Sequence, residues 1–183
     1  MLFWGKSMAT DEKIDWHKDI FDVLRKQNIS LIAHVPDAGH TSLIDLCEMQ
    51  SDMDIVTLTT EEEGVGLLCG AWSGNRKGVL LMQSSGVGNC INALASITRA
   101  CNFPLLMLVT MRGEWNEFNS WQVPMGKATE KVLSALYINV VRCETADEVQ
   151  DTVYAMMGLA YKSNSATAVL LSQRLIGSKT FKE

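Results

Sequence analysis

Residues 54–89 read DIVTLTTEEEGVGLLCGAWSGNRKGVLLMQSSGVGN, and this stretch decides the fold. The β-rich run 54–59 is predicted as a strand, and the small apolar run 62–72 as a helix. The apolar run 78–83 is predicted as a second strand. Two strands joined through a helix form the repeating unit of a parallel β-sheet.

The same alternation continues in both directions along the chain. Apolar, β-rich runs predict six strands, at 29–35, 54–59, 78–83, 104–110, 137–143 and 167–172. Amphipathic runs predict helices at 12–27, from Thr41 or Ser42 onward, and at 62–72, 89–100, near 127–136 and 145–162. Apolar strands separated by helices predict an α/β fold, with a six-stranded parallel sheet and helices on both faces. Ligands of such folds bind at the carboxyl ends of the strands.

The chain is expected to form one domain. No Ser/Pro/Gly-rich linker, repeat or low-complexity tract divides residues 12–183, and a chain of this length can build a hydrophobic core without disulfides. Residues 1–11 are expected to be disordered or an extension, with Met8 as an alternative start.

The composition excludes several classes of protein. The formal charge of −5 argues against a nucleic-acid binder, and no apolar run reaches the length of about 18 residues that a membrane helix needs. No secretory signal pattern is present. The histidines lack metal-site spacing, and the cysteines form no CxxC pair, a pattern typical of reduced, buried thiols in a cytoplasmic protein. The cysteines are Cys47, Cys69, Cys90, Cys101 and Cys143.

Residues 112–127 (RGEWNEFNSWQVPMGK) form a long polar connection that contains Trp115, Phe118 and Trp121. Connections of this length in a compact α/β unit are usually functional or packed against another surface. The segment can be interpreted as a loop packed on its own domain, or as an interface or active-site wall.

The first polar cluster at a predicted strand end is TTEEEGVG, residues 59–66. Carboxylates favour a helix N-terminus, which accounts for three consecutive glutamates without any further function. The small apolar sequence that follows would let another surface approach closely, and it would leave one glutamate poorly solvated.

The second polar cluster is MQSSGVGN, residues 82–89. Ile91 occupies the third glycine position of a dinucleotide-binding fingerprint, and no GKS or GKT follows as in a P-loop. A tight glycine turn into a helix capped by Ser85 or Asn89 accounts for the glycines. It does not account for the polar residues 83–85, which are expected to line a crevice.

Taken together, these blocks resemble a known family. VP-x-A (35–38), TEEEGVGLLCGAW (60–72), LLMQSSGVGNCINALAS (80–96), RGE (112–114) and VPMGK (123–127) look like the alpha subunit of sulfopyruvate decarboxylase and the matching domain of phosphonopyruvate decarboxylase. The resemblance covers roughly residues 12–175 and points to the thiamine diphosphate superfamily.

The resemblance implies a pyrimidine-binding domain, which shares its cofactor with a diphosphate-binding domain, usually across a subunit interface. The second domain normally carries a GDG motif and a later Asn that anchor Mg²⁺ and the diphosphate. No GDG occurs in this sequence. These contacts are therefore expected from a beta subunit, in a hetero-oligomer.

The resemblance also implies a catalytic glutamate. In the family, this side chain binds N1′ of the aminopyrimidine and favours its imino tautomer, so that the 4′-nitrogen can take the thiazolium C2 proton. It lies nine positions before the glycine that ends the small-residue helix. Gly70 therefore selects Glu61, and a slip of one residue would select Glu62. A carboxyl suits this task because it can donate or accept at one place, and desolvation favours its protonated form.

Other site residues follow from the same resemblance. The cofactor-pocket candidates are Pro36, Gln83, Ser84 and Ser85, and the substrate candidates are Asp37, His40 and Arg112. Related decarboxylases often carry cysteine at the position of Asp37. His40 is either a proton relay or anion-binding group, or a histidine at a helix start with no catalytic role. Arg112 is a candidate partner for a sulfonate or phosphonate, because a guanidinium fork matches tetrahedral oxyanions, and an exposed structural arginine is the alternative.

The expected function is that of the alpha subunit of a 2-oxo acid decarboxylase, of the sulfopyruvate or phosphonopyruvate type. A split-subunit carboligase, or a non-catalytic binding or regulatory module with the same fold, are the alternatives.

Overall fold

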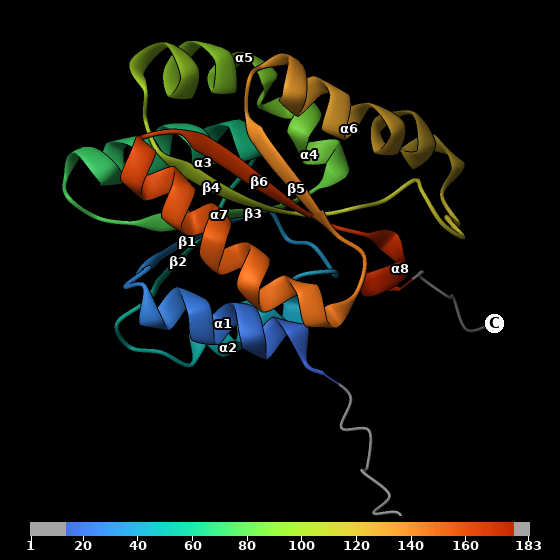
Figure 1. The fold of residues 1–183 in the computed structure, drawn as a ribbon, viewed down its shortest axis with the longest axis horizontal. Coiled ribbons are helices and arrows are strands. Elements are labelled where there is room, and N and C mark those ends of the chain that lie inside the picture. The colour runs from blue at the N-terminus through green and yellow to red at the C-terminus, as the bar shows by residue number, and fades with distance from the viewer. Residues whose placement is uncertain (1–13, 178–183) are drawn as a thin grey trace, which may run out of the picture.

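The computed structural model describes residues 14–177. The expected extension at 1–11, and the outer parts of the predicted domain at 12–13 and 178–183, lie outside the described residues. Within the described range, strands and helices alternate along the chain (Figure 1).

The strands of residues 14–177 form one sheet in the order β2-β1-β3-β4-β6-β5, and every neighbouring pair is parallel. The strands are β1 (Leu31–His34), β2 (Asp54–Thr57), β3 (Gly78–Gln83), β4 (Leu105–Thr110), β5 (Asn139–Cys143) and β6 (Ala166–Leu171). The predicted six-stranded parallel sheet is confirmed. Because all strands run the same way, their carboxyl ends meet at one edge of the sheet.

Helices cover both faces of the sheet. They are α1 (Trp16–Lys26), α2 (Thr41–Glu48), α3 (Glu61–Ser73), α4 (Ser84–Asn89), α5 (Ile91–Ala93), α6 (Val123–Ala135), α7 (Val149–Ser163) and α8 (Gln173–Ile176), with a π-helical turn η1 (Leu94–Arg99) and 3₁₀ turns η2 (Ser120–Gln122) and η3 (Ala146–Glu148). In Figure 1, α1, α2 and α7 lie on one side of the sheet, and α3 to α6 lie on the other.

Successive side chains of the central strands point to opposite faces of the sheet, so these strands contribute to two hydrophobic cores, one on each face. Leu81 of β3 packs into the core under α1, α2 and α7, whereas its neighbours Leu80 and Met82 pack into the core under α3, α4 and α6. The strands β3 and β4 are buried almost throughout, which explains why their sequences read as continuous apolar runs.

The glycine turn predicted after β3 was wrong, whereas the helix predicted at 89–100 corresponds to α5 and η1. A glycine turn and a helix at 89–100 were expected, but α4 begins directly at Ser84 and contains both Gly86 and Gly88. The helical path then breaks at Cys90 and continues through α5 and η1. Neither Ser85 nor Asn89 caps the N-terminus, because Gln83 is the first flanking residue and makes no side-chain cap bond.

Three smaller expectations also need correction. The helix predicted near 127–136 begins earlier, at Val123, with Pro124 in its first turn, where a missing backbone N–H costs nothing. A short helix, α8, follows the last strand and was not predicted. Cys101 is exposed, while the other four cysteines are free and buried as expected. None of the helices in residues 14–177 has both the length and the apolar character needed to cross a bilayer.

The close approach of α3 to the sheet depends on Gly64. A Cβ atom at this position would lie 2.6 Å from Leu80 Cδ1 and 2.8 Å from Leu58 Cδ1. A side chain there would push the first turns of α3 away from β3.

Replacing Gly64 with Ala is expected to lower the free energy of unfolding by about 1–3 kcal/mol, because overpacking outweighs the gain in helix propensity. The matched control is Gly158→Ala in α7, where an added Cβ would meet nothing within 4 Å. That change should stabilise the protein by about 0.5–1 kcal/mol. Urea denaturation of both variants measures the difference, and equal effects would contradict this account of α3.

Candidate functional site

The predicted site residues gather at the carboxyl edge of the sheet. The strand β1 lies between β2 and β3. From β1 the chain continues to β2 on one side, and from β3 it continues to β4 on the other side. Such a change of direction opens a crevice where ligands of parallel sheets bind. Residues 36–40 follow β1, Glu61 follows β2, and residues 83–89 follow β3.

Glu61, the first residue of α3, is 6% exposed. Asn89, at the end of α4, donates a hydrogen bond from Nδ2 to Oε2 of Glu61 at 2.9 Å. The carboxyl also lies against Gly86, where an added Cβ would be 2.3 Å from Glu61 Oε1. The two strand ends therefore bring Glu61 and α4 into direct contact.

The neighbouring glutamates are placed differently. Glu62 is exposed. Glu63 is also exposed, and its Oε2 accepts a hydrogen bond from the backbone N–H of Thr59 at 2.9 Å, which helps to start the helix. Of the three consecutive glutamates, Glu61 alone is buried.

The glycines of α4 allow other elements to approach, and their role is not that of a turn. Gly86 leaves room for the Glu61 carboxyl, and a Cβ added at Gly88 would lie 3.5 Å from the Met125 side chain of α6. Sequence reasoning missed Gly86 and Asn89 as site residues. The only signal in the sequence was the spacing between the EEE and GVGN blocks.

The polar residues at the end of β3 divide into two kinds. Gln83 and Ser85 are partly exposed, and Pro36, in the loop after β1, is exposed. Ser84 is fully buried, and its Oγ accepts a hydrogen bond from the backbone N–H of Arg112 at 3.1 Å. Ser84 was expected to line the crevice, but its hydroxyl joins the ends of β3 and β4.

The loop after β1 is fixed to the end of β4. Thr110 Oγ1 donates a hydrogen bond to Asp37 Oδ2 at 2.5 Å, and Asp37 stays partly exposed. His40 is fully buried, and its Nε2 lies 3.1 Å from the carbonyl oxygen of Leu108. A carbonyl can only accept, so the proton sits on Nε2. Burial lowers the pKa of His40, which favours the neutral ring, and Nδ1 has no hydrogen-bond partner among the described residues. These features support the interpretation of His40 as a structural histidine.

The alternative of an exposed structural arginine was wrong about exposure, because Arg112 is buried, but its contacts are those of a structural residue. Its Nε lies 2.8 Å and its Nη2 2.5 Å from the two carboxylate oxygens of Glu117, and both side chains are almost fully buried. The backbone N–H groups of Gly113 and Asn119 and the amide of Gln173 also donate to Glu117. These donors, with Arg112 as the largest cause, lower the pKa of Glu117 to about 2.

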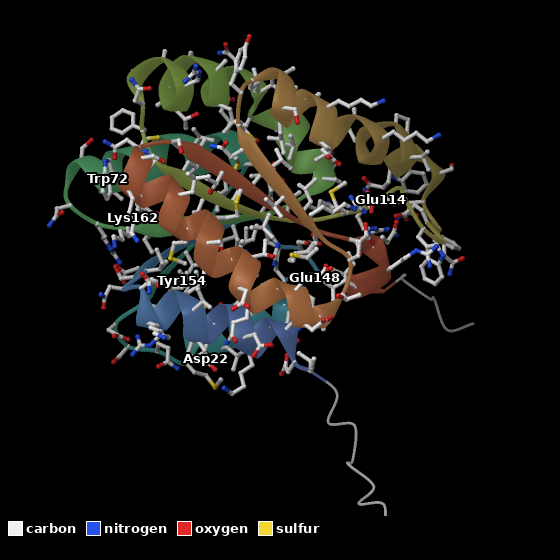
Figure 2. All side chains as sticks on the ribbon, in the orientation of Figure 1. Asp22, Trp72, Glu114, Glu148, Tyr154 and Lys162 are labelled. Carbon is white, nitrogen blue, oxygen red and sulfur yellow. The ribbon has the colours of Figure 1, made fainter. Side chains whose placement is uncertain are left out.

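The same network holds the long loop after β4. Gln173 Oε1 accepts hydrogen bonds from the backbone N–H groups of Glu114 and Trp115. Glu114, labelled in Figure 2 close to α8, also accepts two hydrogen bonds from Arg142 of β5. The polar part of the loop thus packs on its own domain, while its aromatic side chains are exposed. These are Trp115, Phe118 and Trp121.

The candidate site is built around one buried carboxyl, that of Glu61. No group of three His, Cys, Asp or Glu side chains able to hold a metal ion occurs among residues 14–177. Glu61 offers a buried carboxyl that accepts from a neutral amide and lies against a glycine.

Comparison with known proteins agrees with this geometry. A family profile described as "Thiamine pyrophosphate enzyme, N-terminal TPP binding domain" matches residues 15–125. The chain belongs to this family. Thiamine pyrophosphate is another name for thiamine diphosphate. The residues that form the candidate site after β1, β2, β3 and β4 all lie within the matched range.

Two kinds of curated relative stand out for this family member. A sulfopyruvate decarboxylase subunit alpha from Methanococcus maripaludis is 32% identical over 83% of this chain and 91% of the relative. A phosphonopyruvate decarboxylase from Streptomyces viridochromogenes is 30% identical, over 63% of this chain and 29% of the relative. Among solved structures, a 2-oxoglutarate:ferredoxin oxidoreductase from Magnetococcus marinus matches 93% of this chain and 31% of its own, with a TM-score of 0.72 and 13% identity. At that identity, the likeness shows the fold alone.

The ion pair of Arg112 and Glu117 gives a pH prediction. Because the folded-state pKa of Glu117 is lowered from 4.5 to about 2, the pair stabilises the fold fully above pH 4.5, and this stabilisation is lost as the pH falls toward 2. Glu117→Gln should cost about 3 kcal/mol at pH 7, because it leaves a buried guanidinium unpaired.

Urea denaturation at pH 7, 5 and 3 should show the gap between wild type and Glu117→Gln narrowing toward pH 3. Glu130→Gln, at an exposed position of α6, is the control and should change the free energy of unfolding by less than about 0.5 kcal/mol. A gap that is the same at every pH would show that the ion pair is not its cause.

Proposed function

We propose that this chain is the alpha subunit of a thiamine diphosphate-dependent 2-oxo acid decarboxylase of the sulfopyruvate or phosphonopyruvate type. The observation that carries the proposal is the carboxyl of Glu61, which is buried at the carboxyl edge of the sheet and held by a neutral amide. Membership of the cofactor-binding family, and relatives named as sulfopyruvate decarboxylase subunit alpha, support it.

A beta subunit would complete the site. The relatives' designation as subunit alpha implies another subunit, and the absence of GDG in this sequence leaves the diphosphate and Mg²⁺ to be held by that partner. The outer face of α3 has room for a neighbouring chain, because added Cβ atoms at Gly66 and Gly70 would meet nothing within 4 Å. Leu67 of the same helix is a large hydrophobic side chain that is exposed.

In the proposed reaction Glu61 acts on the aminopyrimidine ring. When bound, thiamine diphosphate supplies the nucleophilic carbon that attacks the 2-oxo group and then serves as the electron sink for decarboxylation. Glu61 holds or releases a proton at the pyrimidine N1′ position, for which its buried carboxyl is suited. We assign Gln83, Ser85 and Pro36 to the wall of the pyrimidine pocket, and Ser84 to the support behind it.

The substrate contacts are shared with the partner. Glu117 neutralises Arg112, and burial keeps His40 uncharged, so neither side chain offers a free positive charge to a sulfonate or phosphonate. We therefore assign the contact with that anionic group to cations of the beta subunit. Asp37, which Thr110 holds at the crevice, forms part of the substrate pocket wall.

Replacing Glu61 with Gln is expected to reduce turnover by about a hundredfold or more when the beta subunit and cofactor are present, because an amide cannot exchange the proton. Glu62→Gln is the matched control, since this neighbour is exposed, and it should retain wild-type turnover. Decarboxylation is measured as carbon dioxide release from sulfopyruvate and phosphonopyruvate. Near wild-type turnover in Glu61→Gln would contradict the proposal, and the reverse pattern would assign the role to Glu62.

Product analysis tests the reaction type. A decarboxylase should release free aldehyde and carbon dioxide in equal amounts. Hydroxyketone products would instead identify a carboligase with the same architecture.

A further inference from the structure

We propose that Asn89 is the positioning residue for Glu61, holding one carboxylate oxygen so that the other is presented to the pyrimidine ring. This inference rests on the proposed function of Glu61 and extends it to α4. The contact that carries it is the hydrogen bond of 2.9 Å from Asn89 Nδ2 to Glu61 Oε2.

Asn89 is well placed to act as a donor because α4 packs against α6, β3 and α3. Thr129 Oγ1 of α6 donates to the backbone oxygen of Ser84 at 3.3 Å, and the Cys90 thiol donates to the backbone oxygen of Gly86 at 3.1 Å. The first anchor ties the start of α4 to α6, and the second tightens the helix just before its end. Asn89 itself is exposed, and it projects from the end of a helix that is hydrogen-bonded to α6 at its start.

The Glu61 carboxyl is constrained on both oxygens. Asn89 binds Oε2, while Oε1 lies against Gly86, where an added Cβ would come within 2.3 Å of this oxygen and 2.5 Å of the carboxyl carbon. Any larger residue at position 86 would displace the carboxyl. The amide and the glycine thus define one orientation of the side chain.

An amide suits this task better than a cation. The N–H of Asn89 can donate to Glu61 whether the carboxyl is ionised or protonated, because it binds an oxygen that accepts in both forms. A cation would hold the carboxyl ionised, as Arg112 does for Glu117, whose pKa falls to about 2. Asn89 therefore orients Glu61 without fixing its protonation state.

The test uses the assembled enzyme with its beta subunit and thiamine diphosphate. Asn89→Ala should lower kcat by about ten- to a hundredfold, with KM changed by less than about threefold. Asn89→Asp should be worse, because a carboxylate would then face a carboxylate. The exchange rate of the cofactor C2 proton with deuterium, measured by NMR without substrate, should fall in parallel. Asn92→Ala, at an exposed asparagine three residues later, is the matched control and should leave both quantities unchanged.

A double-mutant cycle separates positioning from a general structural effect. In the Glu61→Gln background, Asn89→Ala should cause no further loss of exchange rate, because the group through which it acts is already gone. Thermal melting and the cofactor dissociation constant should stay close to wild type in Asn89→Ala. Gly86→Ala, which displaces the carboxyl from the other side, should also slow the exchange.

The outcomes distinguish the two proposals. If Glu61→Gln stops C2 exchange while Asn89→Ala and Asn89→Asp do not slow it, the positioning role of Asn89 is overturned and the proposed function stands. An equal loss from Asn89→Ala in both backgrounds, or a loss that follows a lower melting temperature, would also overturn it. If Glu61→Gln itself leaves exchange and turnover unchanged, both proposals fail.

Discussion

The candidate site depends on one close approach, that of the Glu61 carboxyl on α3 to the backbone of α4. Two glycines permit it. Gly64 lets the first turns of α3 lie against Leu58 and Leu80, and Gly86 leaves the space that the carboxyl fills. Because the strands β2 and β3 flank β1 in a parallel sheet, the helices that follow them start at the same edge. The strand order therefore brings Glu61 to the same edge of the sheet as α4, and the two glycines determine how closely the carboxyl packs against that helix.

Two glutamates of this chain with buried side chains differ in the groups that hold them. Glu117 accepts hydrogen bonds from Arg112, from two backbone N–H groups and from Gln173. This network lowers the pKa of the Glu117 carboxyl to about 2. Such a group can fix a loop but has no proton to exchange near neutral pH. Glu61 is equally hidden from solvent but is held by the neutral amide of Asn89. Its hydrogen-bond partner is an uncharged amide, whereas Glu117 is paired with a guanidinium.

The inner strands β1, β3, β4 and β6 could be predicted from the sequence because buried parallel strands read as continuous apolar runs. The helix after β3 could not, because the glycines in 84–89 have the composition of a turn. These glycines allow Glu61 and Met125, which are distant in the sequence, to pack against α4. Glu117 was missed for the same reason, because the sequence around it does not indicate which groups donate hydrogen bonds to its carboxylate. The choice of Glu61 over Glu62 came from the family resemblance, and the burial of Glu61 beside an exposed Glu62 supports it.

The charges of the candidate site residues fit the proposal that a second chain completes the site. Arg112 is neutralised by Glu117, His40 is held neutral by burial, and Asp37 adds a carboxylate at the rim. A diphosphate or an anionic 2-oxo acid would find no unpaired cation among these candidate residues. A cofactor with a neutral ring at one end and a charged diphosphate at the other therefore suits a divided site. In the proposed enzyme, this chain would receive the ring against Glu61, and the beta subunit would supply the metal and the positive charge across the open face of α3.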